Sequence, residues 1–182
     1  MDNNRIEEFP RSGSVLYKLI CEDEKVKGKT LKRYKKLNKY LILPLYRLRI
    51  LPLFGFGKLF LILTTKGRIS GKKRKTPLEY HRWKGVITVV SGRGEDADWL
   101  KNLRANPDGV SIRYGFRSFQ PRIEFIEDEK EKIERIKWYV TKHPKVAKML
   151  FGWNSKTDDL ETANFSKLIR LITLIQFHQK IE

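Results

Sequence analysis

Two short blocks of positive charge hold the residue types best suited to binding an anion. Lys25 to Arg49 contains ten basic residues and no acid, and Lys66 to Lys75 contains six more and no acid. Clustered cations repel one another, which costs stability unless an anion lies among them. Three partners suit this pattern: nucleic acid, an anionic membrane surface and a polyanionic small molecule.

The glycines around the second block invite comparison with phosphate-binding loops. In GRISGKKRK, residues 67–75, three residues rather than four separate the glycines, and Lys73 stands where a magnesium-binding hydroxyl is required. The GFG at 55–57 precedes an expected strand instead of following one, so it lacks the setting of a dinucleotide fingerprint. We therefore expect the anion to be bound without either nucleotide motif.

Neither a metal centre nor a disulfide is expected. The three histidines, at positions 81, 143 and 178, have no second histidine or carboxylate at metal-ligand spacing. Cys21 is the single cysteine, which excludes an intramolecular disulfide and a thiolate-rich metal site and is typical of a reducing compartment.

The first basic block has the pattern of an amphipathic helix. Its apolar positions recur at spacings of three and four, at Tyr34, Leu37, Leu41, Leu45 and Leu48. Pro44 predicts a stop or kink, and Pro52 predicts an end before it. Such a helix either packs on its own core or lies on an anionic membrane.

The chain is expected to be cytoplasmic. The N-terminus, MDNNRIEEFP, lacks the cationic start and apolar centre of a secretory signal. Apolar stretches stay well short of the ~20 residues that a membrane-spanning helix needs. The basic helix could still give peripheral contact with the inner face of an anionic membrane.

The elements that position these residues predict an α+β domain. The chain has 182 residues, a net charge of +18 and 40% hydrophobic residues, which suits one packed unit. Short apolar runs predict strands over 59–65, 78–83, 86–90, 110–114 and 119–126. Helices are expected near 98–103 and from about 129 to before Pro144, while 167–180 reads as strand or helix.

These strands are joined mostly by tight turns, which favours a small antiparallel barrel or sheet with an inserted helix and flanking N- and C-terminal helices. We divide the chain into a basic amphipathic segment, 1–57, and a barrel domain, 58–182, that form one structural unit.

Two motifs make the prediction specific. LILTTKGRISGKKRKTPLEY, residues 61–80, is followed after one strand by SGRGEDADWLKNLRANP, residues 91–107. Together they resemble the deazaflavin-dependent nitroreductase family, also called deazaflavin-dependent quinone reductases. The resemblance implies a split β-barrel and an 8-hydroxy-5-deazaflavin, coenzyme F-420, with a phospholactyl and oligoglutamate tail. It also implies an oxidoreductase that transfers hydride to a quinone, a nitro compound or a similar electron-poor acceptor.

The resemblance also indicates which residues bind this cofactor. The first motif supplies the cations, turn and apolar wall: Arg68, Ser70, Gly71, Lys72, Lys73, Arg74, Lys75, Pro77 and Leu78. The second motif supplies Ser91, Gly92, Arg93, Trp99 and Asn102. Arginine grips phosphate or carboxylate bidentately and lysine serves as a mobile point charge, so the set suits a polyanionic tail.

The proton donor is harder to assign. Family members active on quinones or nitro compounds often carry tyrosines shortly after a proline that follows the C-terminal helix. Here Pro144 is followed by KVAKMLF, without a tyrosine. Tyr114 and Tyr139 are the substitute catalytic candidates, and Val146, Met149, Phe151 and Trp153 could form an apolar pocket for the acceptor.

Several alternatives remain open. The same barrel could hold FMN, whose single phosphate needs fewer cations. A basic nucleic-acid-binding module without catalysis would also use the charge and the aromatic residues, although most aromatics fall in apolar runs. A third alternative is a protein that carries the deazaflavin without turnover. By resemblance alone, a homodimer is expected.

Overall fold

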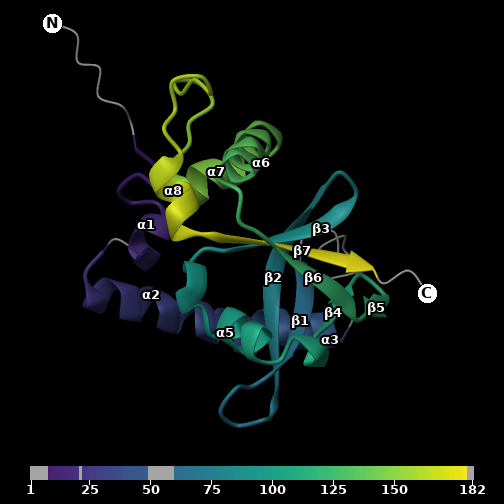
Figure 1. Ribbon diagram of the computed structural model, residues 1–182. Helices are drawn as coiled ribbons and strands as arrows, with labels where there is room; N and C mark the ends of the chain where they lie inside the picture. Colours follow the sequence, from purple (N-terminus) through teal and green to yellow (C-terminus); the bar gives the residue numbers. More distant parts are fainter. Residues whose placement is uncertain (1–7, 21, 49–59, 180–182) are drawn as a thin grey trace, which may run out of the picture.

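A seven-stranded antiparallel sheet forms the centre of the computed structural model, which describes residues 8–20, 22–48 and 60–179 (Figure 1). The strand order is β5-β4-β1-β2-β3-β7-β6. The strands are β1 (Phe60–Lys66), β2 (Lys73–Trp83), β3 (Val86–Ser91), β4 (Ser111–Tyr114), β5 (Arg117–Phe119), β6 (Pro121–Ile126) and β7 (Thr173–Gln179). The sheet curls into a split barrel, so the predicted α+β class is confirmed.

The first strand pairs over its whole length with β2. Leu61 and Leu63 are buried, and Thr64 lies opposite Lys75 in the register. Strand β2 therefore begins at Lys73, five residues before the expected start. The predicted strand start at residue 78 is corrected here: Lys73, Arg74 and Lys75 are strand residues, because the β-branched end of β1 continues the ladder.

Helix α5 (Asp98–Ala105) lies between β3 and β4 in sequence and packs on β1 through Leu100 and Leu103. Ala97 occupies its N-cap position without a side-chain bond, and Asp98 is the first helical residue. Helix α6 (Glu129–Lys142) is capped by Asp128, which accepts from the backbone N of Glu131 at 2.7 Å. It ends before Pro144, as predicted.

The C-terminal part contains two further helices, α7 (Pro144–Phe151) and α8 (Ser166–Leu171). The segment 167–180, predicted as strand or helix, contains both: most of α8 comes first, and β7 follows it directly. Figure 1 shows α6, α7 and α8 gathered at one end of the barrel, with α1 (Val15–Ile20) beside them.

The N-terminal basic segment is helical through α2 (Glu24–Leu37), a π-helical turn η1 (Asn38–Ile42) and α3 (Leu43–Arg47). Of the two alternatives predicted at Pro44, a stop or a kink, the stop is wrong. The wider turn before it, where the backbone N of Leu43 donates to the Asn38 carbonyl, accommodates a proline that cannot donate, and the helix continues. Tyr46 then anchors α3 by donating to the Arg113 carbonyl at 3.2 Å. The region around Pro52 lies outside the described residues.

Two clusters of buried side chains hold the fold together. One fills the barrel, and the other lies among α6, α7, α8 and the N-terminal residues. Phe9 stacks on Phe165 with ring centroids 5.2 Å apart, and Leu16 belongs to the same cluster. The segment before the barrel thus shares a core with the C-terminal helices.

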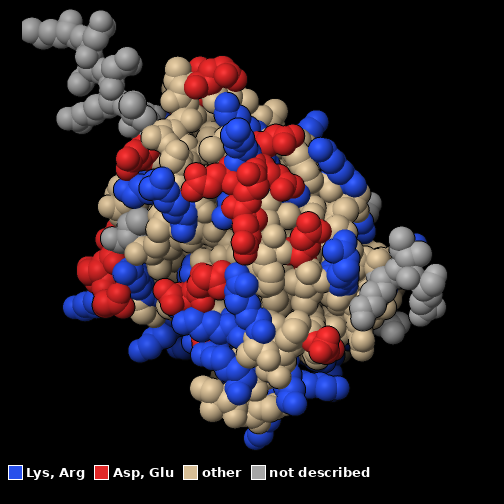
Figure 2. Space-filling view, viewed as in Figure 1, with Lys and Arg blue, Asp and Glu red and all other residues tan. Residues whose placement is uncertain are grey.

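Charge is unevenly distributed on the surface. Figure 2 shows Lys and Arg gathered at the lower end, near the β1–β2 turn, while Asp and Glu gather over and around α6. Among the described residues, none of the helices is long and apolar enough to cross a membrane.

Candidate functional site

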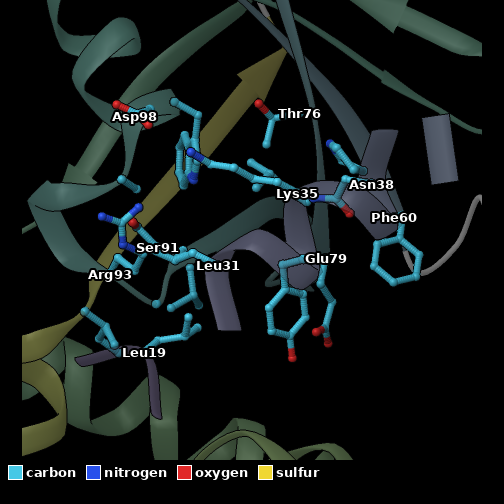
Figure 3. A pocket seen from close by; sticks show the side chains of 18 of the residues that line it. Leu19, Leu31, Lys35, Asn38, Phe60, Thr76, Glu79, Ser91, Arg93 and Asp98 are labelled. Carbon is cyan, nitrogen blue, oxygen red and sulfur yellow. The ribbon is translucent and has the colours of Figure 1, made fainter. Parts of the chain in front are cut away.

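A cavity of about 1350 Å³ runs along β2 and is walled by residues from both ends of the chain. Figure 3 shows side chains that surround it: Leu19 and Leu31 from the N-terminal helices, Thr76 and Glu79 from β2, and Arg93 from the loop after β3. Residues from Lys73 to Glu79, and His81, border this space. At ~3.3 Å per strand residue, the stretch from Lys73 to His81 spans about 26 Å.

The β1–β2 turn shapes one end of the cavity. The backbone N of Gly67 donates to the Lys72 carbonyl at 2.9 Å, and that of Gly71 donates to the Gly67 carbonyl at 2.8 Å. Gly71 has a φ of 65°, which favours glycine. A Cβ on Gly67 would lie 2.9 Å from the Ser70 hydroxyl oxygen. The turn therefore favours glycine at position 71 through its backbone conformation and at position 67 through close packing.

Arg68, one of the cations at this end, is held in place by residues of the second motif. The backbone N of Arg68 donates to Asn102 Oδ1 at 3.1 Å, and its Nη1 donates to the same oxygen at 3.2 Å. Its Nη2 lies 3.3 Å from Asp98 Oδ1. Asn102 is buried, so the contact fixes the turn against α5 and joins the two motifs in space.

The other cations of this end lack a carboxylate partner. In the described ranges, no acidic side chain lies within ion-pair distance of Lys72, Lys73, Arg74 or Lys75. Arg74 Nη2 donates to the Ser70 hydroxyl at 3.3 Å. These charges are thus available to an external anion.

The loop after β3 closes the adjacent wall. Ser91 is buried, and its hydroxyl donates to the Gly94 carbonyl at 2.7 Å. A Cβ on Gly92 would come within 2.5 Å of Leu16 Cδ2, so α1 packs directly against this loop. Helix α5 begins a few residues after this loop without a side-chain cap, so side chains do not satisfy its first backbone N–H groups, at the positive end of the helix dipole.

Comparison with known proteins agrees with this arrangement. Residues 53–150, more than half of the chain, match the family of the F420H(2)-dependent quinone reductase. The chain belongs to this family. It is a deazaflavin-dependent oxidoreductase whose cofactor is coenzyme F-420. Curated proteins provide no match.

Several solved structures are similar to parts of this family member. An F420-H2 dependent reductase is 27% identical, with 65% of this chain and 94% of that chain covered and a TM-score of 0.42. A domain-swapped dimer is 26% identical, with 66% and 81% covered and a TM-score of 0.44. A conserved hypothetical protein from Mycobacterium tuberculosis is 16% identical, with 72% and 79% covered and a TM-score of 0.45.

The residues present suit the family cofactor. A tail with a phosphodiester and several carboxylates needs cations that internal acids do not neutralise, and those of β2 meet this requirement. Pro77, Leu78 and Trp99 add an apolar wall beside them, as an aromatic ring system requires. The cavity therefore fits both halves of such a molecule.

The opposite end of the cavity is aromatic. Tyr139 on α6 donates from its hydroxyl to Glu79 Oε1 at 2.9 Å. Burial, together with the negative charge and hydrogen bond of Glu79, raises the pKa of Tyr139 above its usual range. The His81 ring lies 5.4 Å from the Tyr139 ring, and burial, His143 and Arg135 lower the pKa of His81 to about 4. At neutral pH, this end holds a phenol and a neutral imidazole.

Most residues implied by the sequence motifs border the cavity. These are Arg68, Ser70, Lys73, Arg74, Lys75, Pro77, Leu78, Ser91, Gly92, Arg93, Trp99, Asn102 and Tyr139. Gly71 and Lys72 lie in the exposed turn outside the lining. Tyr114 lies elsewhere on the barrel and does not border the cavity; its ring lies 6.0 Å from the Tyr80 ring and 6.1 Å from the Phe119 ring.

The sequence predicted Tyr139, Met149 and Phe151 of the aromatic end, but it missed the N-terminal wall and the β2 residues of that end. Leu16, Leu19 and Leu31 line the cavity, although the basic segment was expected to pack on the core or on a membrane. Glu79 and His81 were also missed. They follow the implied Pro77 at every second position of one strand, and this alternation is the signal that could have found them.

Proposed function

We propose that this oxidoreductase reduces a quinone at the aromatic end of the cavity while the cationic end of β2 holds the cofactor tail. The observation that carries the proposal is the polarity of one continuous cavity. Its β1–β2 end has cations without acidic partners, and its other end has Met149, Phe151 and Tyr139. When bound, the reduced deazaflavin supplies a hydride from carbon 5 of its central ring.

Binding and orientation are the first tasks of the chain. Lys73, Arg74 and Lys75 would hold the anionic tail, and the uncapped start of α5 would add backbone donors. Because Asn102 and Asp98 hold Arg68 in place, the turn meets the tail already ordered. Preorganisation lowers the entropy cost of binding.

Water exclusion depends on the helices. Leu16 and Leu19 from α1 and Leu31 from α2 add apolar side chains to the wall of the cavity. Apolar walls remove water from the space in which hydride and electron acceptor must meet, and they hold the two reactants close together. The N-terminal segment is thereby part of the site.

The Tyr139–Glu79 pair would supply the proton to the reduced acceptor. Because the pKa of Tyr139 is raised, its Oη keeps its proton and donates it in a hydrogen bond to Glu79 Oε1. This bond fixes the Glu79 carboxyl at the cavity surface. In this proposal Glu79 exchanges protons with water and passes one to the reduced acceptor, while Tyr139 positions it.

The assay that tests this function follows oxidation of the reduced deazaflavin by menadione, a simple naphthoquinone, and by a nitroaromatic compound in parallel. We expect turnover with the quinone. Binding of the deazaflavin without turnover of either compound would support a carrier instead, and tighter binding of FMN than of the deazaflavin would support the FMN alternative. DNA binding that collapses with salt, without deazaflavin binding, would support the nucleic-acid alternative.

We also propose that the N-terminal helices hold the enzyme at an anionic membrane. The supporting observation is a set of exposed apolar side chains next to lysines: Tyr40 is 68% exposed, Leu48 66% and Leu41 47%. Substituting all three with Ser should abolish co-sedimentation with phosphatidylglycerol-containing vesicles, and neutral vesicles serve as the control. The homodimer remains a prediction, for which sedimentation velocity is the direct test.

A further inference from the structure

One face of the first basic block borders the cavity. The lining residues of α2 and η1 recur at spacings of three and four, which is the pattern of a single helical face: Leu31, Tyr34, Lys35, Asn38 and Lys39. Figure 3 shows Lys35 extending from this face into the cavity. The turn η1 also packs beside β2. The two basic blocks, separate in the sequence, therefore border the same space.

The two lysines of this face carry charge that no acid of the chain offsets. In the described ranges, no carboxylate lies within ion-pair distance of Lys35 or Lys39. The Lys35 side chain is exposed, and Lys39 Nζ lies 5.0 Å from the centroid of the Tyr40 ring. The cations of β2 likewise lack a carboxylate partner. Like charges around one cavity repel one another until an anion lies among them.

Helix α2 is held mainly through the elements at its two ends. None of its 14 residues is buried. On one side Leu16 of α1 belongs to a buried cluster, and on the other Tyr46 of α3 is 1% exposed. Lysines four residues apart also destabilise a helix by repulsion. A helix with few buried contacts opens at a low cost in free energy, so an anion that neutralises these lysines should stabilise it.

We infer that Lys35 and Lys39 bind the anionic tail of the deazaflavin together with the cations of β2, and that this contact stabilises α2. The inference rests on the proposed function, in which the β2 cations hold this tail. A phosphodiester and several carboxylates present anionic oxygens in several directions, so cations from two elements can bind them at once. Lysine suits this task because its flexible stem lets the ammonium group follow the tail. The sequence motifs that indicate the cofactor include no residue of α2.

Two matched double variants test the inference. K35Q/K39Q removes the two cavity lysines, and K32Q/K36Q removes two lysines of the same spacing that do not border the cavity. Each is titrated by fluorescence with the intact deazaflavin and with its tail-free form, at about 0.15 M salt, where screening confines charge effects to about 8 Å. We expect K35Q/K39Q to lose about fivefold to tenfold in affinity for the intact molecule. It should change less than about twofold for the tail-free form, and K32Q/K36Q less than about twofold for both.

Hydrogen exchange of the backbone amides in residues 25–39 is a second readout, which does not depend on affinity or turnover. At saturating concentrations, the intact deazaflavin should slow this exchange in the natural protein and in K32Q/K36Q, whereas the tail-free form should not. K35Q/K39Q should lose most of the slowing. Equal affinity losses in the two double variants would overturn the inference, and so would a K35Q/K39Q variant that binds the intact molecule and slows exchange as the natural protein does.

Failure of this inference and failure of the proposed function give different results. An unchanged K35Q/K39Q variant beside a weakened K73Q/R74Q/K75Q variant would overturn the role of α2 alone. Equal affinity of the natural protein for the intact and tail-free forms would instead contradict the tail site itself, and absent menadione turnover would contradict the proposed reaction.

Discussion

The Tyr139 hydroxyl and the Glu79 carboxylate, 60 residues apart in sequence, meet at 2.9 Å and join helix α6 to strand β2 inside the cavity. The donor is more than nine-tenths buried, at 7% exposure, whereas Glu79 is exposed to the cavity. A buried phenol therefore aims a carboxyl group at the space in which the electron acceptor is expected.

Removing the phenol hydroxyl should affect the reaction more than the fold. Y139F keeps the ring in its cluster and loses one hydrogen bond, which we expect to cost about 1 kcal/mol of unfolding free energy. With Glu79 no longer positioned, kcat for menadione should fall while the deazaflavin Kd stays the same. Y114F is the matched control, because Tyr114 does not line the cavity. Equal kcat losses in the two variants would contradict the assignment.

His81 should make the protein sensitive to mild acid. Burial, then His143 and Arg135, lower the pKa of His81 in the folded state to about 4, below the value near 6.5 of the unfolded chain. Between these values only the unfolded state binds the proton. Stability contributed by the neutral imidazole is thus fully present above about pH 6.5 and falls by about 1.4 kcal/mol per pH unit toward pH 4.

Urea unfolding at several pH values measures this effect. The natural protein should lose stability from pH 6.5 to 4.5, and H81Q should show a flatter profile because it carries no titrating group at this position. H178Q is the control, since His178 lies on β7 away from the cavity. Parallel profiles for the natural protein and H81Q would show that other groups control its acid sensitivity.

The contact between Gly92 of the second motif and Leu16 of α1 should tolerate no added side-chain volume. G92A places a Cβ within 2.5 Å of Leu16 Cδ2, and we expect it to cost about 1–3 kcal/mol of unfolding free energy and to weaken deazaflavin binding. L16A removes the clashing methyl group. The double variant should then bind the deazaflavin better than G92A alone, measured by fluorescence titration. Additive losses would mean that the two residues do not interact.

Much of this fold follows from local pattern. The apolar run of β1, the tight turn between β2 and β3 and the Pro144 boundary of α6 all lie where the sequence predicts them, because each depends on a few neighbouring residues. The start of β2 and the continuation of helix through Pro44 do not. The start of β2 is set by pairing with β1. The helix through Pro44 depends on a π-helical turn that no nearby residue predicts.

The site likewise has one part that local sequence predicts and one part that depends on tertiary packing. Contiguous motifs indicated the cationic end, since Arg68 to Leu78 are close in sequence. The aromatic end depends on tertiary packing: Arg135 has the spacing of a solvent-facing helical residue, yet it is 3% exposed against the sheet. Leu16 and Leu31 belong to helices whose periodicity shows an apolar face without showing what that face covers.

The central claim is that the β2 cations grip the tail of the deazaflavin, and one titration tests it most directly. The variant K73Q/R74Q/K75Q is compared with K130Q/K142Q/K145Q, which removes the same charge from exposed residues away from the cavity. Both are titrated with the intact deazaflavin and with its tail-free form. We expect the first variant to lose about 100-fold in affinity for the intact molecule, to change less than about twofold for the tail-free one, and the control to change little. Equal affinity of the natural protein for the two forms, or equal losses in the two variants, would contradict the account.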